Sequence, residues 1–465
     1  MKILFPFVGD SVGGSHKSAI ILIKSLMSNK INIHIVLHID NGPLSDYLKL
    51  HKLQYEVFPI KSLVGDTPSL FKIAYGTFIN FYKLFFYVRK NNITIVHAND
   101  LRMNLTWSVP VKFTPVKFIW HQRTLLSSSY LWKLISYLSD HFIAISKVVH
   151  STSPSNIPVL RKHLIYNPIS AGPLYKSDTR LQSQSIRKKY GISEDNVLLG
   201  YVGRLSEEWK RVDFLISCFS TFKANKNYHL LIVGNCDSIY CKKLKKIVFN
   251  MKIEHNVSFI GFISDPMPII SSLDILIAPS RNEPFGRTLL ESMSQKTVVL
   301  ASNSGGHRET ISDNNGFLFE LDDCRDLDKK IKYIQDNHEL VKGVVENAYH
   351  YVINNFSPSS HMKKVLDLYK PDVLLDLDTS EIQRTILNEV CSVKKVPYIT
   401  IEYPRYESWI TPTFNLGLGQ ELFFREQYKA NLKENLSIEI QDILNFKNQD
   451  KIMAKRFMND STSSY

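Results

Sequence analysis

The sequence predicts an α/β protein with two lobes, each a parallel sheet covered by helices, followed by a smaller C-terminal α/β extension. Three observations lead to this fold class. Short β-branched or aromatic runs alternate with helix-spaced stretches almost throughout the chain. The alternation pauses in a polar stretch at 176–189 and restarts at 197, and a third α/β segment begins near 370. Strands separated by helices pair in parallel and are covered on both faces.

The first lobe begins with the apolar run 3–7, a glycine-containing loop at 9–14 and a stretch of helical spacing at 16–29. Later strands are short and rich in β-branched or aromatic residues, which favour strands. They are expected at 33–39, 56–60, 93–97 and 117–120.

The second lobe repeats this pattern, and a cleft between two such lobes binds ligands at the carboxyl ends of the strands. Its strands are expected at 197–203, 229–233, 257–260, 275–278 and 298–301. We therefore predict an N-terminal lobe at 1–174 and a second lobe at 175–355. A crossover helix at about 356–369 is expected to return to the first lobe. An appended partial segment follows at 370–465, with strands at 371–377 and 397–402 around a helix at 380–392.

Composition narrows the class of protein. Of 465 residues, 44% are apolar and 22% charged, which is typical of a globular domain and excludes disordered and collagen-like chains. The net charge of +13 favours anionic partners such as nucleoside diphosphates, acidic membrane faces or nucleic acid. No nucleic-acid-binding module is recognisable. No run of 18 uncharged apolar residues occurs, so no membrane-spanning helix is expected.

Five cysteines are too few and too scattered for a disulfide framework in a chain of this length. Cys236 and Cys241 have C-x4-C spacing without a second pair or nearby histidines, which argues against zinc. We expect reduced thiols and hence a cytoplasmic protein.

The segment S-R-N-E-P-F-G-R-T-L-L-E at 280–291 is the densest signal of a site. Pro284 and Gly286 suit a tight turn after an apolar strand, and Thr288 suits the start of a helix. Because a helix N-terminus behind such a turn offers backbone N–H groups and a positive dipole end, it can hold a phosphate. The plain alternative is a strand, loop and helix with two surface glutamates.

The two glutamates of this segment, Glu283 and Glu291, are eight residues apart. A glycosidase pair needs its carboxyl groups roughly 5–10 Å apart. Eight helical residues rise about 12 Å. Two separate hydrogen-bonding tasks along one extended ligand fit the spacing better than a hydrolytic pair.

This segment resembles the E-x7-E signature of the family 4 glycosyltransferases, which have the GT-B fold of two Rossmann-like lobes facing a cleft. The resemblance covers residues 1 to about 369 and rests on several motifs in order. They are G-R-L at 203–205 with Lys210, L-I-V-G at 231–234, S-G-G-H-R-E at 304–309 and N-N-G-F-L at 314–318.

The resemblance implies a role for each matching residue of the second lobe. Arg204, after Gly203, and Lys210 would bind the donor diphosphate, where cations offset the charge on a leaving phosphate; a solvated basic face is the alternative. Glu283 would bind hydroxyls of the donor sugar and Glu291 those of the ribose. Sugar or phosphate oxygens would be held by backbone N–H groups around Phe285, Gly286 and Arg287, at the helix start before Thr288.

In the first lobe the resemblance points to Gly14 and His121. Gly14 lies in the glycine turn after the first strand, which matches neither G-x-G-x-x-G nor the P-loop. His121 ends the strand 117–120, where the family has a histidine facing the donor sugar. The alternatives are a turn without function and a strand-end histidine bonded to the backbone. His97 has an analogous place, and we interpret it as structural.

Two departures from the family pattern are visible: Asn235 replaces a second glycine after Gly234, and Ser15-His16 replaces an acidic residue after the glycine turn. The family's contacts to the acceptor are therefore the part of the resemblance that applies least directly to this sequence. No D-x-D stands at the end of an expected strand of the two lobes, and Asp376-Leu377-Asp378 lies in the appended segment. With Arg204 and Lys210 at the diphosphate, neither a metal nor another cofactor is expected.

The resemblance implies a retaining hexosyltransferase that moves a sugar from a nucleoside diphosphate to a glycan or lipid-linked acceptor in cell-surface polysaccharide synthesis. A catalytically silent GT-B scaffold and a nucleotide-sugar epimerase are the alternatives. An aromatic-rich helix at 71–86 that ends in Arg89-Lys90, and the lysine run at 242–246, are compatible with peripheral contact at the inner membrane face. We favour the plainer interpretation of a core helix and a solvated lysine face.

Overall fold

The chain divides by its internal contacts into two compact units, residues 1–368 and 369–465. The computed structural model describes residues 1–60, 70–127, 130–170, 172, 174, 179–205, 208–222, 227–235, 239–369, 374–377, 398–402 and 411–413.

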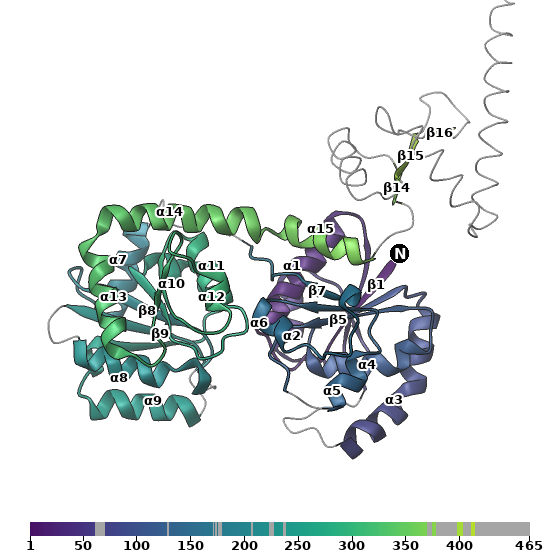
Figure 1. The fold of residues 1–465 in the computed structure, drawn as a ribbon, viewed down its shortest axis with the longest axis horizontal. Helices are drawn as coiled ribbons and strands as arrows, with labels where there is room; N and C mark the ends of the chain where they lie inside the picture. The colour runs from purple at the N-terminus through teal and green to yellow at the C-terminus, as the bar shows by residue number, and fades with distance from the viewer. Residues whose placement is uncertain are drawn as a thin grey trace, which may run out of the picture. The chain divides into compact units, whose positions relative to one another are not determined.

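The first unit opens with a seven-stranded sheet in the order β3-β2-β1-β4-β5-β6-β7, with every pair parallel. The strands are β1 (Lys2–Phe7), β2 (Asn32–Leu37), β3 (Glu56–Val57), β4 (Ile95–Ala98), β5 (Lys117–Gln122), β6 (His141–Ala144) and β7 (Lys162–Leu164). Helices connect them: α1 (Gly14–Ser28), α2 (Pro43–Leu50), α3 (Leu70–Lys90), α4 (Leu101–Lys112), α5 (Tyr130–Ser136) and α6 (Lys147–Ser151) (Figure 1).

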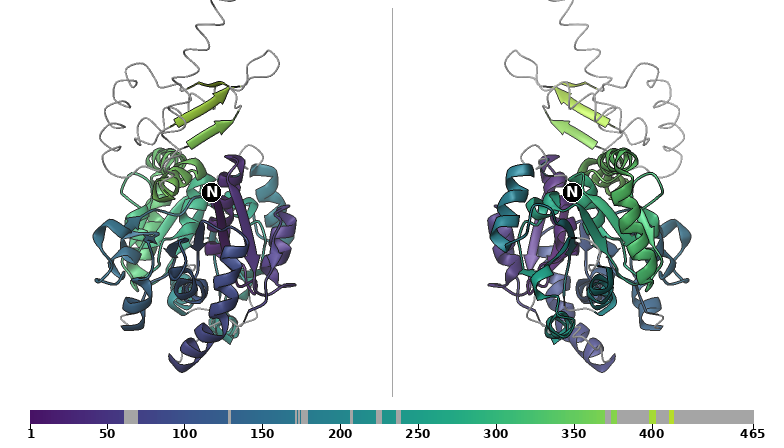
Figure 2. Two further views of the ribbon diagram at one scale, coloured as in Figure 1. Left: turned by 90° about the vertical axis from the view of Figure 1, so that its right-hand side faces the viewer. Right: turned by 90° about the vertical axis from the view of Figure 1, so that its left-hand side faces the viewer.

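A second parallel sheet follows in the order β10-β9-β8-β11-β12-β13. Its strands are β8 (Val197–Val202), β9 (Tyr228–Val233), β10 (Val257–Gly261), β11 (Ile275–Ala278), β12 (Val298–Ser302) and β13 (Phe317–Phe319). Its helices are α7 (Thr179–Tyr190), α8 (Val212–Phe222), α9 (Ile239–Asn250), α10 (Met267–Ser272), α11 (Arg287–Ser294), α12 (His307–Thr310), α13 (Cys324–Asp336) and α14 (His338–Asn355). The predicted α/β class with two parallel-sheet lobes is confirmed (Figures 1 and 2).

Each sheet reverses its strand order at one point, between β1 and β4 in the first lobe and between β8 and β11 in the second. The central strands carry uninterrupted apolar runs and are buried; Ile3, Leu4 and Phe5 have no exposed surface. Ligands of such sheets bind beyond the carboxyl ends of the strands at the reversal. The loops after β1, β8 and β11 therefore lie where a ligand of these sheets is expected to bind.

The chain crosses back from the second lobe to the first through α14 and α15 (Pro358–Tyr369). Figure 1 shows α14 lying along the second lobe and α15 along the first. Three hydrogen bonds hold this return: Ile169 N donates to Phe356 O at 2.8 Å, Asn29 Nδ2 donates to Met362 Sδ at 3.1 Å, and His361 Nδ1 donates to Tyr166 O at 2.8 Å.

The cysteines differ from expectation. Cys218 of α8 and Cys324, the first residue of α13, form a disulfide with their Cα atoms 5.2 Å apart. The expectation of reduced thiols is therefore wrong for this pair. The two residues are 106 positions apart in sequence, and they meet because α8 and α13 pack on the same face of the second sheet.

In the second unit the structure describes a three-stranded sheet. It contains β14 (Leu374–Leu377), β15 (Tyr398–Glu402) and β16 (Thr411–Thr413). β14 and β15 pair in parallel, and β16 is antiparallel to β15. The helix expected at 380–392 lies outside the described residues.

Candidate nucleotide-sugar site

The loop between β11 and α11, together with the first turns of α11, carries six of the eleven predicted site residues. It ends at Gly286, which has φ 87° and ψ 44°, a left-handed conformation that a side chain disfavours. The helix begins at Arg287, with Thr288 in its first turn. The first N–H groups of a helix have no acceptor within it, so this turn is suited to bind oxygen atoms.

The backbone of the glycine pair Gly305-Gly306 packs directly against the backbone of this loop. A Cβ on Gly305 would lie 2.7 Å from both N and O of Glu283, and one on Gly306 would lie 2.8 Å from Cα of Phe285. Gly306 N also donates to Glu283 O at 2.7 Å. The G-G-x-x-E turn is thus glycine-rich because two backbones pack together there.

Lys210 and Glu283, two residues predicted to bind the donor, are joined to each other. Lys210 Nζ lies 2.7 Å from Glu283 Oε2, and both side chains are mostly buried. Burial alone would raise the pKa of Glu283, but Lys210 and His307 outweigh it and hold that pKa below its ordinary value. The carboxylate therefore stays ionised, as an acceptor of hydrogen bonds.

Glu291 is likewise paired with a cation. Arg287 Nε lies 2.7 Å from Glu291 Oε1, one turn further along α11. The same guanidinium reaches the first lobe, where Nη1 donates to Ser18 Oγ at 2.5 Å and to Pro168 O at 3.3 Å. Arg287 thus connects the signature helix to the helix behind the glycine turn.

Arg204 lies against the glycine turn of the other lobe. A Cβ on Gly13 would be 2.6 Å from Nη2 of Arg204, and one on Gly14 would be 3.4 Å from Cδ of Arg287. The Arg204 loop is itself set by glycine: a Cβ on Gly234 would lie 2.0 Å from Gly203 O. The structure therefore brings Arg204, Arg287 and the glycine turn together.

The first lobe contributes groups that sequence reasoning missed. Asp10 and Arg102 form a two-pronged ion pair, with Nη1–Oδ2 at 2.5 Å and Nη2–Oδ1 at 2.8 Å. His16 Nδ1 accepts from Gly13 N at 3.2 Å. Burial, with Arg123 and Arg204 nearby, lowers the pKa of His16 to about 4, so its ring is neutral. Only the replacement of the acidic residue after Gly14 marked this position in the sequence.

Three further hydrogen bonds join the lobes at the N-terminus of α6. Ser146 Oγ donates to Pro284 O at 2.5 Å. Glu309 accepts from Lys147 N at 2.6 Å and from Val148 N at 2.7 Å. The glutamate of the G-G-x-x-E turn thus caps a helix of the opposite lobe, a role that the sequence did not indicate.

His121 is placed differently from expectation. It lies within β5 rather than after it, and its ring is fully buried. His97 Nε2 lies 3.0 Å from His121 Nδ1, and the buried Arg123 donates to that same atom at 3.4 Å. Burial, with Arg123 nearby, lowers the pKa of both histidines well below the ordinary value. The role of His121 toward the donor sugar stays a prediction.

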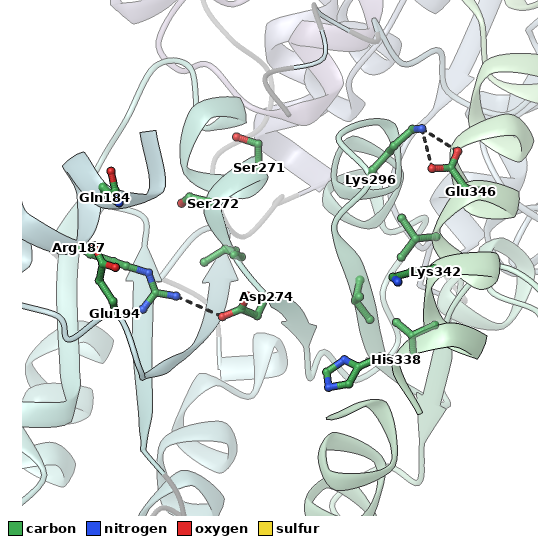
Figure 3. A pocket seen from close by; sticks show the side chains of 14 residues that line it. Gln184, Arg187, Glu194, Ser271, Ser272, Asp274, Lys296, His338, Lys342 and Glu346 are labelled. Atoms are coloured by element: carbon green, nitrogen blue, oxygen red, sulfur yellow. Dashed lines mark hydrogen bonds and ion pairs between the residues drawn. The ribbon is translucent and has the colours of Figure 1, made fainter. Parts of the chain in front are cut away.

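A cavity of about 560 Å³ lies elsewhere, at the amino end of the second sheet (Figure 3). It is lined by Asp274, which precedes β11, and by Val298, which begins β12. Its charges are largely paired, Arg187 with Asp274 at 3.3 Å and Lys296 with Glu346 at 2.6 Å. It shares no residue with the site predicted from the sequence.

Within the part of the chain that the structure describes, no group of three His, Cys, Asp or Glu side chains is arranged to hold a metal ion. The metal-free donor site stays a prediction.

Two Rossmann-like lobes, each with a loop at its strand reversal, and a C-terminal helix that returns to the first lobe define a GT-B fold. The structure aligns with the crystal structure of Anabaena Alr3699/HepE in complex with UDP and glucose, with a TM-score of 0.66 and 21% identity over 79% of this chain and 99% of that one.

Residues 182–351, within the second lobe, match the profile of the family Glycosyl transferases group 1. Two curated relatives are similar over about half of this chain. The "Uncharacterized glycosyltransferase MJ1607" of Methanocaldococcus jannaschii is 26% identical over 51% of this chain and 61% of its own length. The "Capsular polysaccharide biosynthesis glycosyltransferase CapM" of Staphylococcus aureus is 24% identical over 51% and 63%. Each match thus spans about three-fifths of the relative.

Proposed function

We propose that the protein is a glycosyltransferase that moves a sugar from a nucleoside diphosphate onto a glycan or lipid-linked acceptor in polysaccharide synthesis. The family of the second lobe supports the reaction class. The observation that carries the proposal is the position of Arg204, which lies at the Gly13 turn of the opposite lobe. A diphosphate held there would meet a cation and backbone N–H groups together.

In this proposal the donor lies across the loops of the second lobe. Arg204 and Lys210 neutralise the diphosphate as charge develops on it. Glu283, kept ionised, accepts hydrogen bonds from hydroxyls of the sugar, and Glu291 accepts from the ribose. Each carboxylate is already paired with a cation at 2.7 Å. Its negative charge therefore stays compensated while its oxygen atoms also accept hydrogen bonds from the donor.

We propose that the reaction retains the anomeric configuration and needs no metal. The acceptor hydroxyl oxygen forms its bond to the anomeric carbon on the face from which the bond to the β-phosphate oxygen breaks. The hydroxyl proton passes to that phosphate oxygen, and the nucleoside diphosphate leaves. The contacts of α6 with Pro284 and Glu309 draw the lobes together and so exclude water from this step.

The proposal also covers which acceptor is used and where it enters the site. The relative CapM is named for capsular polysaccharide biosynthesis. A growing glycan or a lipid-linked sugar would enter between the glycine turn and the Asp10–Arg102 pair. A lipid-linked acceptor places the enzyme at the inner face of a membrane.

The test is release of nucleoside diphosphate from UDP-, GDP- and ADP-sugars, with and without a bacterial lipid extract. We expect one donor to be consumed, faster with extract, and Arg204→Ala to be slower by two to three orders of magnitude, about 3–4 kcal/mol of transition-state stabilisation. Lys329→Ala on α13 is the control. Turnover of Arg204→Ala equal to that of the unaltered protein, or consumption of none of the donors, would reject the proposal in favour of a silent scaffold.

A further inference from the structure

The outward face of α3 carries a line of exposed aromatic side chains. Their exposed fractions are 64% for Tyr75, 74% for Phe78, 63% for Tyr82 and 60% for Phe86. Steps of three, four and four residues keep them on one side of a helix. We call these four residues the aromatic stripe.

The opposite side of α3 already provides the contact with the core. Leu84 and Val88 have no exposed surface, and Asn80 and Tyr87 are nearly buried. Between the two sides, Phe81 stacks on Phe85 at 5.9 Å and meets Phe113, itself 67% exposed, at 5.4 Å. The interpretation of α3 as a core helix therefore holds for one side only, and the stripe is an additional apolar surface.

Basic side chains surround the stripe. Lys83, Arg89 and Lys90 of α3 are exposed, as is Lys112 at the end of the adjacent α4. Neither α3 nor α4 contains an acidic residue. The charged side chains of these two helices are therefore all positive.

We propose that the aromatic stripe binds the surface of an anionic bilayer, with its rings at the boundary between headgroups and acyl chains. Aromatic side chains favour that boundary, and lysine and arginine beside them are attracted to acidic lipid headgroups. The membrane contact rests on the proposed function for its biological role. It extends that function because an enzyme bound to the membrane surface meets a lipid-linked acceptor there. Across the described residues no helix is long and apolar enough to cross a bilayer, so the contact is peripheral.

The size of the stripe distinguishes this partner from a second protein. An aromatic side chain buries about 150–250 Å², so the exposed parts of four rings supply about 500 Å². A stable protein interface buries about 800 Å² on each partner. The stripe is too small for a lasting dimer, whereas an interfacial helix needs only one such face.

The experiment is cosedimentation of the intact protein with vesicles, without any nucleotide sugar, so that its outcome is independent of catalysis. One vesicle is pure phosphatidylcholine and the other contains an equal amount of phosphatidylglycerol. We expect binding to the anionic vesicle, weakened by salt, and at least about tenfold weaker binding for Phe78→Ser/Tyr82→Ser. Both side chains are exposed, so the melting temperature is expected to stay unchanged.

Phe249→Ser is the matched control, because Phe249 is 70% exposed but has no second exposed aromatic side chain beside it on α9. Equal weakening by this control, or equal binding of the double variant and the unaltered protein, would overturn the proposal. So would binding to neither vesicle together with a dimer, dispersed by the double variant, in sedimentation equilibrium. As a second readout, the indole emission of Phe78→Trp should shift to shorter wavelength on anionic vesicles, and an unshifted spectrum would count against the proposal.

Discussion

Lys210 and Glu283 form an ion pair, with Nζ 2.7 Å from Oε2, that joins the loop after β8 to the loop after β11. Each glutamate of the E-x7-E segment holds a cation in this way, since Arg287 lies 2.7 Å from Glu291. The acceptors proposed for the donor hydroxyls are therefore in place before the donor binds. This preorganisation lowers the cost of ordering the site.

Removing one partner of this pair is expected to destabilise the fold. Lys210→Ala leaves a mostly buried carboxylate without its cation, which costs about 3 kcal/mol in the free energy of unfolding. Adding Glu283→Gln to Lys210→Ala removes the unpaired charge and should restore more than about 1 kcal/mol of that loss. Urea unfolding of the two single variants and the double variant measures this coupling. Additive changes would show that the two groups act independently.

Gly13→Ala is expected to impair the site without impairing the fold. The new methyl group would meet only the end of the Arg204 side chain, at 2.6 Å, and that flexible end can move away. We expect donor turnover to fall at least about tenfold, which is about 1.4 kcal/mol, with an unchanged melting temperature. In the Arg204→Ala background the same substitution should change turnover little. An equal further loss there would mean that Gly13 acts on something other than Arg204.

Gly306→Ala is expected to destabilise the second lobe, because the methyl group would collide with backbone atoms of Pro284 and Phe285 at 2.8–2.9 Å. Overpacking of this kind costs about 1–3 kcal/mol. Gly343→Ala is the matched control: Gly343 lies in α14 with no atom within 4 Å of an added Cβ, and alanine should stabilise the helix by about 0.5–1 kcal/mol. Thermal unfolding should shift in opposite directions for the two variants, and a shift in the same direction would contradict the packing argument.

His38 is expected to make stability depend on pH. Its Nδ1 lies 2.8 Å from Phe58 O, and its Nε2 accepts from Trp107 Nε1 at 3.1 Å, so the folded ring is neutral. Burial lowers its pKa from 6.5 to about 4, against the opposing effect of the Phe58 carbonyl. Between those values the unfolded chain binds a proton that the folded chain does not, so stability is lost as pH falls.

At pH 5 the loss from this group alone reaches about 2 kcal/mol. Urea unfolding at pH 7 and pH 5 measures it, with His38→Gln as the comparison. The variant should be less stable at pH 7 but lose less on acidification than the unaltered protein. Identical losses in both proteins would show that His38 does not titrate as described.

Much of the fold follows from local sequence, because long apolar runs bounded by glycine or polar residues define the central strands. Runs such as 3–7 and 275–278 are buried on both faces and needed no tertiary information. The short strands β6, β7 and β13, which lie at or next to the edges of their sheets, were not predicted as strands. They have three or four residues and pair because the sheet is already formed.

The site was predicted in its residues but not in its contacts. The glycine pair 305–306 and the E-x7-E segment were recognised by sequence, yet nothing local indicated that one packs beneath the other. The Glu309 cap on α6, the Lys210–Glu283 pair and the Cys218–Cys324 disulfide each join residues far apart in sequence. Such pairings depend on how helices and loops pack in three dimensions, and the spacing of residues along the sequence does not predict that packing. For α3 composition predicted the aromatic content but not which side would remain exposed.

The most direct test of the account is whether the intact protein binds nucleotide sugars. Binding is measured by thermal unfolding with UDP-, GDP-, ADP- and CMP-sugars, each in the presence and absence of EDTA. A donor that binds the folded state raises the melting temperature by mass action. We expect one nucleotide class to do so, equally with EDTA, and the shift to be lost in Arg204→Ala. No shift with any donor would contradict the nucleotide-sugar site, and a shift abolished by EDTA would contradict its metal-free chemistry.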